Sequence, residues 1–338
     1  MDYAERVGGI RISGIRRVFE AAGEDAINLG LGQPDFDTPE HVRRAAVDAI
    51  ESGRAAGYTN NAGIESLREA VAEYVDFPAS SEDVLVTSGA SEGLHVAMQT
   101  YVDVGDEVLV PDPGFVSYDA LARVADARPV GVELEDDLRL SPESVKEALG
   151  RDTAAFVVNS PANPTGAVQT EDDARAFAEI ADDHDVVLVS DEVYDRFVYD
   201  GRHHSPAAYG DGVVTVNAAS KTLAATGWRL GYVVASPEAV DEMVKVHQYA
   251  QACANAAAQH AVAETLNAAE TDRAVEEMRD EFELRRDLVV ERLREMGLET
   301  PEPRGAFYVM PRVPEGFVDA CLERDVVVVP GEAFGDAG

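Results

Sequence analysis

Short apolar runs rich in β-branched residues recur along this chain, separated by stretches whose apolar residues return at helical spacing. The strand-like runs cover residues 84–87, 107–110, 154–158, 186–190, 213–217 and 230–234. The helix-like stretches include residues 92–102, 171–183 and 257–267. Strands that alternate with helices predict an α/β fold with a mostly parallel sheet.

The C-terminal part has a different pattern. Residues 271–296 are highly charged but carry apolar residues at helical spacing, among them Val275, Met278, Phe282 and Val289. We expect one long helix there, leading into a smaller domain with strands at 306–310 and 326–329 and a helix at 318–322. The predicted division is an N-terminal arm and part of the small domain at 1–35, a large domain at 36–272, and the rest of the small domain at 273–338.

Composition narrows the class of protein. The chain has 338 residues, 46% of them hydrophobic, which is enough for one large core and a smaller companion. It carries 64 acidic and 28 basic residues, a net charge of -36, and such a surface repels nucleic acid and anionic membranes. This acidic, lysine-poor composition resembles that of proteins from salt-accumulating microbes, where salt screens self-repulsion. We therefore expect adaptation to high salt.

The two cysteines and the apolar runs indicate a cellular setting. Cys253 and Cys321 lie far apart without paired spacing, so neither a disulfide framework nor a zinc site is expected. The first residues lack the apolar stretch of a signal peptide, and no run approaches the roughly 20 apolar residues of a membrane span. We expect a soluble, cytoplasmic protein. His203, His204 and His247 form no chelating set, so no metal is expected.

Small and polar residues follow several of the predicted strands, where open α/β sheets bind their ligands. Ser88-Gly89-Ala90-Ser91 comes after the first strand and opens a helix, so its backbone N–H groups could bind an anion. Packing alone also explains such small residues. The run Asn163-Pro164-Thr165-Gly166 follows a later strand and predicts a rigid turn that aims Asn163 inward, through a cis Asn163–Pro164 bond. An ordinary turn would also explain this run.

Charged residues follow the next two strands. Asp191 and Tyr194 come after the run at 186–190, and a carboxylate there is costly unless a cation meets it. A structural salt bridge would satisfy this requirement as well. Lys221 follows the run at 213–217 and is one of only three lysines in the chain. A lysine amine can form an imine, whereas an arginine guanidinium keeps its proton and is not a nucleophile.

These motifs together resemble the fold-type I pyridoxal-phosphate enzymes, and within them the aspartate aminotransferase-like class I and II aminotransferases. The resemblance extends nearly end to end, from residues 29–36 to residues 330–335. It is most specific in Ser220-Lys221 with Thr226-Gly227-Trp228-Arg229, in Asn163 to Gly166, and in Asp191 to Tyr194. It implies a seven-stranded, mostly parallel central sheet flanked by helices, and a smaller α/β domain built from both chain ends.

The resemblance also implies roles for individual residues around pyridoxal 5'-phosphate. Lys221 would carry the cofactor as a Schiff base and then move a proton between substrate and cofactor. Asp191 would pair with the pyridine nitrogen and keep it protonated, which makes the ring an electron sink. Tyr194 and Asn163 would hydrogen-bond the phenolic oxygen of the cofactor.

Further positions follow from the same resemblance. Phe115 would stack on the pyridine ring, although core packing is an alternative role for this residue. Tyr58 would reach the phosphate bound by a neighbouring subunit, which implies a homodimer with shared active sites. Gly32 and Asn163 would approach the substrate carboxylate. The phosphate itself would be held by Gly89, Ala90, Ser91, Ser220 and Arg229.

The chain departs from the family pattern in three places. Residues 330–335 are followed in the family by a strand bearing an arginine that clamps the substrate carboxylate, and we expect that arginine to lie beyond Gly338. The predicted helix from Ser66 runs abruptly into residues 75–78, and residues 312–314 form a tighter connection than in the family. We expect this chain to lack family residues at both of these junctions.

The resemblance favours transamination between an amino acid and a 2-oxo acid by a ping-pong mechanism, of the aspartate and 2-oxoglutarate type. A C–S β-lyase and a cyclopropane-forming synthase use the same residues and stay open. An aminotransferase-like ligand-sensing regulator is disfavoured, since residues 1–25 are too short for a DNA-binding domain and the surface is acidic. Substrate choice is expected to depend on residues 10–16 and 251–259 and on the neighbouring subunit.

Overall fold

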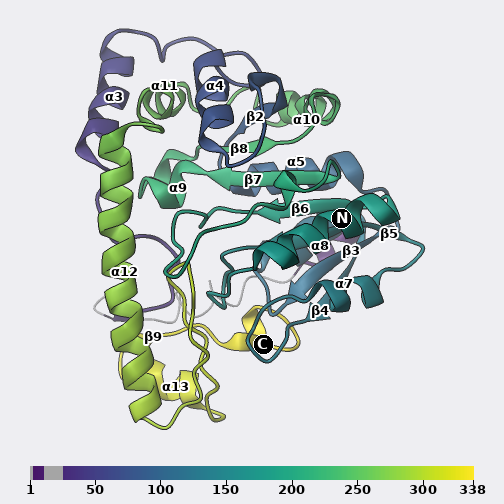
Figure 1. Cartoon of the computed structure of the whole chain (residues 1–338), viewed down its shortest axis with the longest axis vertical. Helices are drawn as coiled ribbons and strands as arrows, with labels where there is room; N and C mark the ends of the chain where they lie inside the picture. Colours follow the sequence, from purple (N-terminus) through teal and green to yellow (C-terminus); the bar gives the residue numbers. More distant parts are fainter. Residues whose placement is uncertain (1–2, 11–25) are drawn as a thin grey trace.

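A seven-stranded sheet forms the centre of the molecule (Figure 1). The computed structural model describes residues 3–10 and 26–338. The strand order is β2-β8-β7-β6-β5-β3-β4, and every neighbouring pair is parallel except those that include β8. The strands are β2 (Val84–Thr87), β3 (Glu107–Asp112), β4 (Arg128–Glu133), β5 (Thr153–Asn159), β6 (Val187–Asp191), β7 (Val213–Ala218) and β8 (Gly231–Val234).

All six strands predicted for this sheet are present, and the fold class is confirmed. β4 was not predicted, because Pro129 and Gly131 interrupt its β-branched pattern. β4 lies at the edge of the sheet, where one side of the strand has no ladder to complete and a proline is tolerated.

Alternate residues of each strand face opposite layers of helices. In β5, Ala155 and Val157 belong to the apolar cluster with α5, α6 and α10, whereas Phe156 and Val158 belong to the cluster with α7 and α8. At the other end of the sheet, β2 and β8 pack against α3, α4 and α11. These helices are α3 (Glu40–Glu51), α4 (Glu65–Tyr74), α5 (Ala90–Tyr101), α6 (Ser117–Val124), α7 (Pro142–Ala148), α8 (Glu171–His184), α10 (Pro237–Ala250) and α11 (Ala256–Thr265). This explains why the strands read as continuous apolar runs, since both faces are covered.

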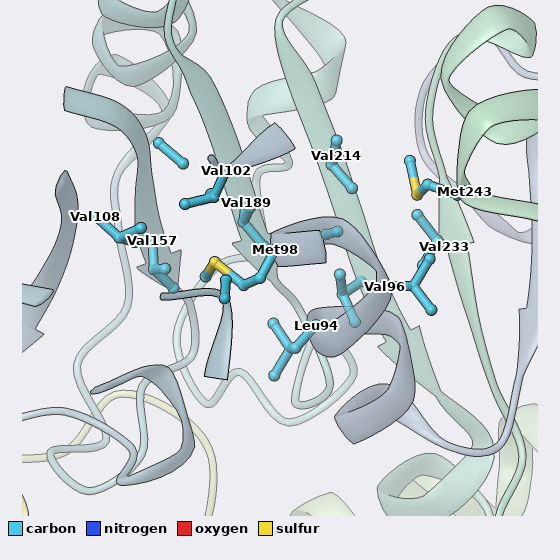
Figure 2. Packing of buried hydrophobic residues seen from close by; sticks show 14 of the residues in the cluster. Leu94, Val96, Met98, Val102, Val108, Val157, Val189, Val214, Val233 and Met243 are labelled. Atoms are coloured by element: carbon cyan, nitrogen blue, oxygen red, sulfur yellow. The ribbon is translucent and has the colours of Figure 1, made fainter. Parts of the chain in front are cut away.

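The centre of the larger core lies between α5 and the sheet. Leu94, Val96 and Met98 of α5 pack beside valines of five strands, and Met243 of α10 joins them (Figure 2). Met98 and Met243 are fully buried. Burial of each large apolar side chain contributes roughly 1.5–3 kcal/mol, so this layer holds the strands, and hence their ends, in place.

A long helix, α12 (Ala269–Glu295), connects the sheet region to the smaller part of the fold, as expected from residues 271–296. Figure 1 shows it running from the end of the molecule with α3 and α11 to the end with β9 and α13. There β1 (Ile27–Asn28) pairs in parallel with β9 (Val326–Val327), so both chain ends contribute, as predicted. The predicted boundary at 272/273 falls inside α12.

One predicted strand is wrong. Residues 306–310 form no strand, and Gly305 makes only an isolated bridge with Val198. Ala306 has a φ of 53°, which breaks an extended backbone, and the Phe307 ring stacks on Phe282 of α12 at 4.9 Å between centroids. Aromatic packing therefore overrides the strand preference of this apolar segment. The predicted strand at 326–329 is confined to β9, and the helix predicted at 318–322 is α13 (Phe317–Leu322).

The remaining elements of residues 3–10 and 26–338 are short. They are α1 (Glu5–Gly8), α9 (Ala219–Thr222) and four 3₁₀ helices, η1 (Ser81–Asp83), η2 (Pro206–Ala208), η3 (Thr226–Trp228) and η4 (Gly331–Ala333). Among the helices of the described residues, none combines the length and the apolar character that crossing a membrane requires.

Candidate active site

The carboxyl ends of β5, β6 and β7 bring the predicted site residues together. In the sheet register Asn159 lies beside Asp191, and Asp191 lies beside Val216. β7 ends at Ala218, and the short helix α9 that follows carries Lys221. Neighbouring parallel strands thus deliver an amide, a carboxylate and an amine to one edge of the sheet, where α/β folds bind their ligands.

The Lys221 amine is held in a mostly desolvated position. Its Nζ donates a hydrogen bond of 2.5 Å to the carbonyl oxygen of Gly32. The rings of Tyr194 and Phe307 lie within 5.7 Å of the same nitrogen. Burial lowers the pKa of Lys221 to about 8; the Asp191 carboxylate opposes this shift and Arg229 adds to it. At pH 7 about a tenth of this amine is therefore uncharged and nucleophilic, a far larger share than for a solvated lysine.

Asp191 is a buried carboxylate with a fixed orientation. Only 3% of the residue is exposed, and the Tyr118 hydroxyl donates a 2.8 Å hydrogen bond to its Oδ2. Burial raises the pKa of Asp191 to about 6, and the neighbouring charge of Glu192 adds to this, while the bonds from Tyr118 and the Val193 N–H oppose it. At pH 7 the group is mainly ionised but poorly compensated, which suits it to bind a cationic ligand atom.

Asn163 and Tyr194 complete the inner part of the site. The Asn159 side chain links the strands, since its Nδ2 donates to the Asp191 carbonyl and its Oδ1 accepts the Asn163 N–H at 2.7 Å. The Asn163–Pro164 bond is cis, as predicted. The Tyr194 hydroxyl lies 2.6 Å from that of Tyr308, and burial raises the pKa of Tyr194 well above its usual value. Tyr194 therefore keeps its proton and can donate it in a hydrogen bond.

The predicted phosphate-binding residues form a cup at the start of α5. Gly89 has a φ of 83°, and a Cβ built on it would lie 2.6 Å from Nη2 of Arg229, so only glycine fits. Gly231 approaches just as closely from β8, because its Cβ would lie 2.6 Å from the Ala90 nitrogen. A helix leaves its first N–H groups without intrahelical acceptors, so those of Ala90 and Ser91 can bind an anion.

Arg229 and Ser220 border this cup. Arg229 is exposed, and its guanidinium donates to the Thr226 and Ser88 carbonyl oxygens at 2.9 and 3.3 Å. Ser220 is 8% exposed and directly precedes Lys221. The cup therefore offers backbone N–H groups, a hydroxyl and a guanidinium, which is a donor set suited to phosphate.

Two other predicted residues lie further out. Phe115 is half-buried, and its ring meets Tyr118, the donor to Asp191, edge to face at 5.6 Å between centroids. Tyr58 is 92% exposed and takes no part in the contacts around Lys221 described above. Most of residues 10–16 lie outside the described residues. Gln259, in the second stretch expected to affect specificity, instead accepts the Ile64 N–H at 2.8 Å and joins α11 to the chain before α4.

Sequence reasoning missed three residues of this site. Tyr118 orients Asp191, Tyr308 contacts Tyr194, and Asn159 fixes Asn163. Asn159 could have been found, because it is the polar residue that directly follows the apolar run at 154–158. Tyr118 and Tyr308 carried no comparable signal, because buried tyrosines within apolar segments usually serve packing.

Two further features lie outside this site. A cavity of about 260 Å³ is lined by Tyr74, Glu192, Asp195 and His203, among others, but not by Lys221 or Asp191. Within residues 3–10 and 26–338, no cluster of three histidine, cysteine or acidic side chains is arranged to hold a metal ion.

Comparison with known proteins shows what the whole chain is similar to. The family model described as aminotransferase class I and II matches residues 24–336. The aspartate aminotransferase of Pyrococcus horikoshii is 42% identical over 99% of this chain and 90% of its own length. The aromatic-amino-acid aminotransferase 2 of Thermococcus litoralis is 40% identical over 100% of this chain and 92% of its own length. The solved structure of Thermus thermophilus aspartate aminotransferase with maleate superposes with a TM-score of 0.94 at 38% identity, covering 99% of this chain and 92% of that one.

The relatives contain internal residues that this chain lacks, as expected for the junctions at residues 75–78 and 312–314. The alignment with the Thermococcus litoralis relative extends over 359 positions, whereas this chain has 338 residues. This chain therefore lacks internal residues that the relative has. The connections at residues 75–78 and 312–314 stay our predicted places for these gaps.

Proposed function

This chain belongs to the class I and II aminotransferases, and on that premise we propose that it transfers amino groups with pyridoxal phosphate bound to Lys221. The observation that carries the proposal is the position of Lys221: a mostly desolvated amine, with a pKa of about 8, after a strand that neighbours the strand bearing Asp191. A structural lysine gains nothing from such a position, because burial disfavours its charge. A lysine that forms an imine requires the uncharged form.

The residues around Lys221 fit the cofactor. The uncharged Lys221 amine would hold the cofactor at its carbonyl carbon, and the same amine would accept and return a proton at the substrate carbon. When bound, pyridoxal phosphate supplies an electron sink for that carbon. The Asp191 carboxylate, fixed by Tyr118, would hold a proton on the pyridine nitrogen. Tyr194 and Asn163 would bind the phenolic oxygen through their hydrogen-bond donors.

The remaining residues bind and orient. The backbone of Gly89, Ala90 and Ser91, with Ser220 and Arg229, would hold the phosphate. Phe115 would pack on the pyridine ring. The backbone of Gly32, whose carbonyl oxygen meets Lys221 Nζ, approaches the substrate carboxylate together with Asn163.

We further propose a homodimer in which Tyr58 completes the neighbouring site. Its 92% exposure leaves the hydroxyl free to reach another subunit, and Val47, Ile50 and Tyr249 are also more exposed than large apolar side chains usually are. A cytoplasmic location stays a prediction.

For the substrates we propose an amino acid and a 2-oxo acid of the dicarboxylic kind, aspartate and 2-oxoglutarate. The names of the relatives support this choice: the Pyrococcus horikoshii protein is an aspartate aminotransferase, and the Thermus thermophilus enzyme was solved with maleate. The Thermococcus litoralis relative carries the name of an aromatic-amino-acid enzyme. A donor screen must therefore include aromatic amino acids.

The test is to trap the imine. Purified protein is mixed with pyridoxal phosphate, treated with borohydride and digested, and the modified peptide is identified by mass spectrometry. We expect a visible absorbance band that borohydride abolishes, and a modification confined to Lys221. Lys221→Ala should show neither, while the control Lys245→Ala, an exposed lysine, should behave as wild type. A folded wild-type protein without a trappable imine would overturn the proposal.

A further inference from the structure

A buried glutamate–histidine pair lies beside the phosphate cup and has no part in the mechanism above. Glu92 is in the first turn of α5 and 9% exposed, and His247 of α10 is fully buried. His247 Nδ1 lies 2.9 Å from Glu92 Oε1. Buried polar groups of this kind cost free energy unless their hydrogen bonds are made, so a specific arrangement must keep them there.

The helix that carries His247 is otherwise apolar on its buried side. Val240, Met243 and His247 form its buried stripe, spaced three and four residues apart. Figure 2 shows Met243 beside Val233 and Val96, in the layer where α10 packs on α5 and the sheet. An apolar side chain at position 247 would continue this stripe. The imidazole instead reaches the one carboxylate in the first turn of α5.

The second carboxylate oxygen of Glu92 contacts the phosphate cup itself. Its Oε2 accepts a short hydrogen bond from the backbone N–H of Ser88, the residue just before Gly89. The carbonyl oxygen of the same Ser88 accepts a hydrogen bond from Nη2 of Arg229 at 3.3 Å. Ser88 is therefore fixed at both its N–H and its C=O, and one line of contacts runs from His247 through Glu92 and Ser88 to Arg229.

The His247 ring makes its side-chain hydrogen bond through one nitrogen only. Within residues 3–10 and 26–338, Nε2 of His247 has no hydrogen-bond partner. Nδ1 is thus the ring nitrogen that holds the side chain in place, and Glu92 is its partner. A pair needed for packing alone would leave neither a carboxylate beside an anion site nor an unsatisfied ring nitrogen.

We propose that Glu92 and His247 are positioning residues that hold the Ser88–Gly89 backbone and Arg229 in the orientation that binds the phosphate of the cofactor. The inference rests on the proposed function. Neither residue touches the ligand: His247 orients Glu92, Glu92 orients Ser88, and Ser88 orients Arg229. Loss of the pair should therefore weaken the binding of a phosphate-bearing ligand and spare the same ligand without phosphate.

The test compares pyridoxal phosphate with pyridoxal, which lacks the phosphate, by measuring dissociation constants from absorbance titrations. Glu92→Ala removes both contacts, whereas Glu92→Gln keeps an acceptor for Ser88 and a polar partner for His247. His247→Leu removes the donor, and His247→Asn keeps an amide near the position of Nδ1. Thermal unfolding of each unliganded variant separates loss of fold from loss of binding.

We expect Glu92→Ala to weaken the binding of pyridoxal phosphate roughly 10-fold, the effect of losing the hydrogen bond that orients Ser88, and the binding of pyridoxal less than about 2-fold. His247→Leu should act in the same direction, with Glu92→Gln and His247→Asn close to wild type. Equal weakening of both ligands, or no rescue by the conservative variants, would overturn the inference alone. A wild-type protein that binds both ligands equally would instead overturn the phosphate cup, and the proposed function with it.

Discussion

The two ends of strand β6 behave in opposite ways although they are only three residues apart. Leu188, near the start, is fully buried among the apolar side chains of α7, α8 and neighbouring strands. Asp191, at the end, is almost as buried but carries a carboxyl group. Burial of Leu188 stabilises the fold, whereas burial of Asp191 raises its pKa to about 6 and so opposes the ionised form.

The interior of the whole sheet differs from its carboxyl edge in the same way: apolar residues are buried in the interior, and ionisable residues at the edge. The strand interiors supply apolar area on both faces, and the edge holds Lys221 with a lowered pKa and Asp191 with a raised one. Each charge is less stable there than in water, so the core supports a site that opposes folding. The contrast predicts that changes at the edge alter chemistry and raise stability where they remove a buried charge, and that changes in the interior lower stability.

The largest effect is expected at the edge, from Lys221→Arg. Arginine keeps the charge but cannot form an imine, so kcat/KM should fall by at least about 10³-fold, or roughly 4 kcal/mol of transition-state stabilisation. The midpoint of thermal unfolding should change little. Steady-state kinetics measure the first quantity and differential scanning fluorimetry the second. The same substitution at exposed Lys245 is the matched control and should leave kcat/KM unchanged.

The next effect belongs to the interior. Leu188→Ala should lower the free energy of unfolding by about 3 kcal/mol, since it removes buried methyl groups and leaves a cavity. Urea titration measures this loss, and Leu288→Ala serves as control because that leucine is 52% exposed. Activity per folded molecule should stay near wild type. A fall in that activity comparable to the effect of Lys221→Arg would show that the interior of the sheet also determines the chemistry.

The interior was also the part that the sequence predicted best. Six of the seven strands and the helices at 92–102, 171–183 and 257–267 follow from apolar periodicity, because both faces of the sheet are covered and each strand is a continuous apolar run. β4 was missed because Pro129 and Gly131 break its pattern. Residues 306–310 were misassigned, because their apolar residues pack into the aromatic cluster around Phe282 rather than into a ladder.

The site was predictable only in part. The resemblance supplied Lys221, Asp191, Asn163 and Arg229, and the structure brings them to one edge of the sheet. Tyr118, which orients Asp191, and the pair of Glu92 and His247 were missed. Their roles arise from contacts between residues 73 and 155 positions apart, and spacing along a single sequence carries no information about such contacts.

Most substitutions lower the free energy of unfolding, whereas we expect a substitution at Asp191 to raise it. The pKa of Asp191 in the folded protein, about 6, lies above the ordinary value of 3.8, so the folded protein loses stability as pH rises between these values. Above pH 6 the full cost of burying the ionised carboxylate is present. Asp191→Asn should therefore stabilise the unliganded protein by about 2 kcal/mol at pH 8.

The gain should vanish near pH 4, where the wild-type carboxyl is protonated in the folded state. Urea titrations of both proteins at the two pH values measure it. Asp319→Asn, a substitution in the exposed part of α13, controls for the general effect of removing one acidic charge. A destabilised Asp191→Asn variant at pH 8 would show that hydrogen bonding from Tyr118 and Val193 outweighs the desolvation of Asp191.

The smallest effect concerns the rate at which Lys221 forms its imine, and it tests whether the burial that disfavours charge also makes the amine reactive. With a pKa of about 8, the uncharged fraction of Lys221 rises about tenfold per pH unit below pH 7 and levels off above pH 8. Stopped-flow mixing of unliganded protein with pyridoxal phosphate should follow this curve, whereas a free lysine analogue, with a pKa near 10.4, should keep gaining rate at pH 9 and 10. Because the Asp191 carboxylate holds the Lys221 pKa up, Asp191→Asn should move the midpoint to lower pH. A midpoint near that of the free analogue would mean that Lys221 is solvated as freely as a surface lysine, and the contrast between the interior and the edge of the sheet would then not extend to its amine.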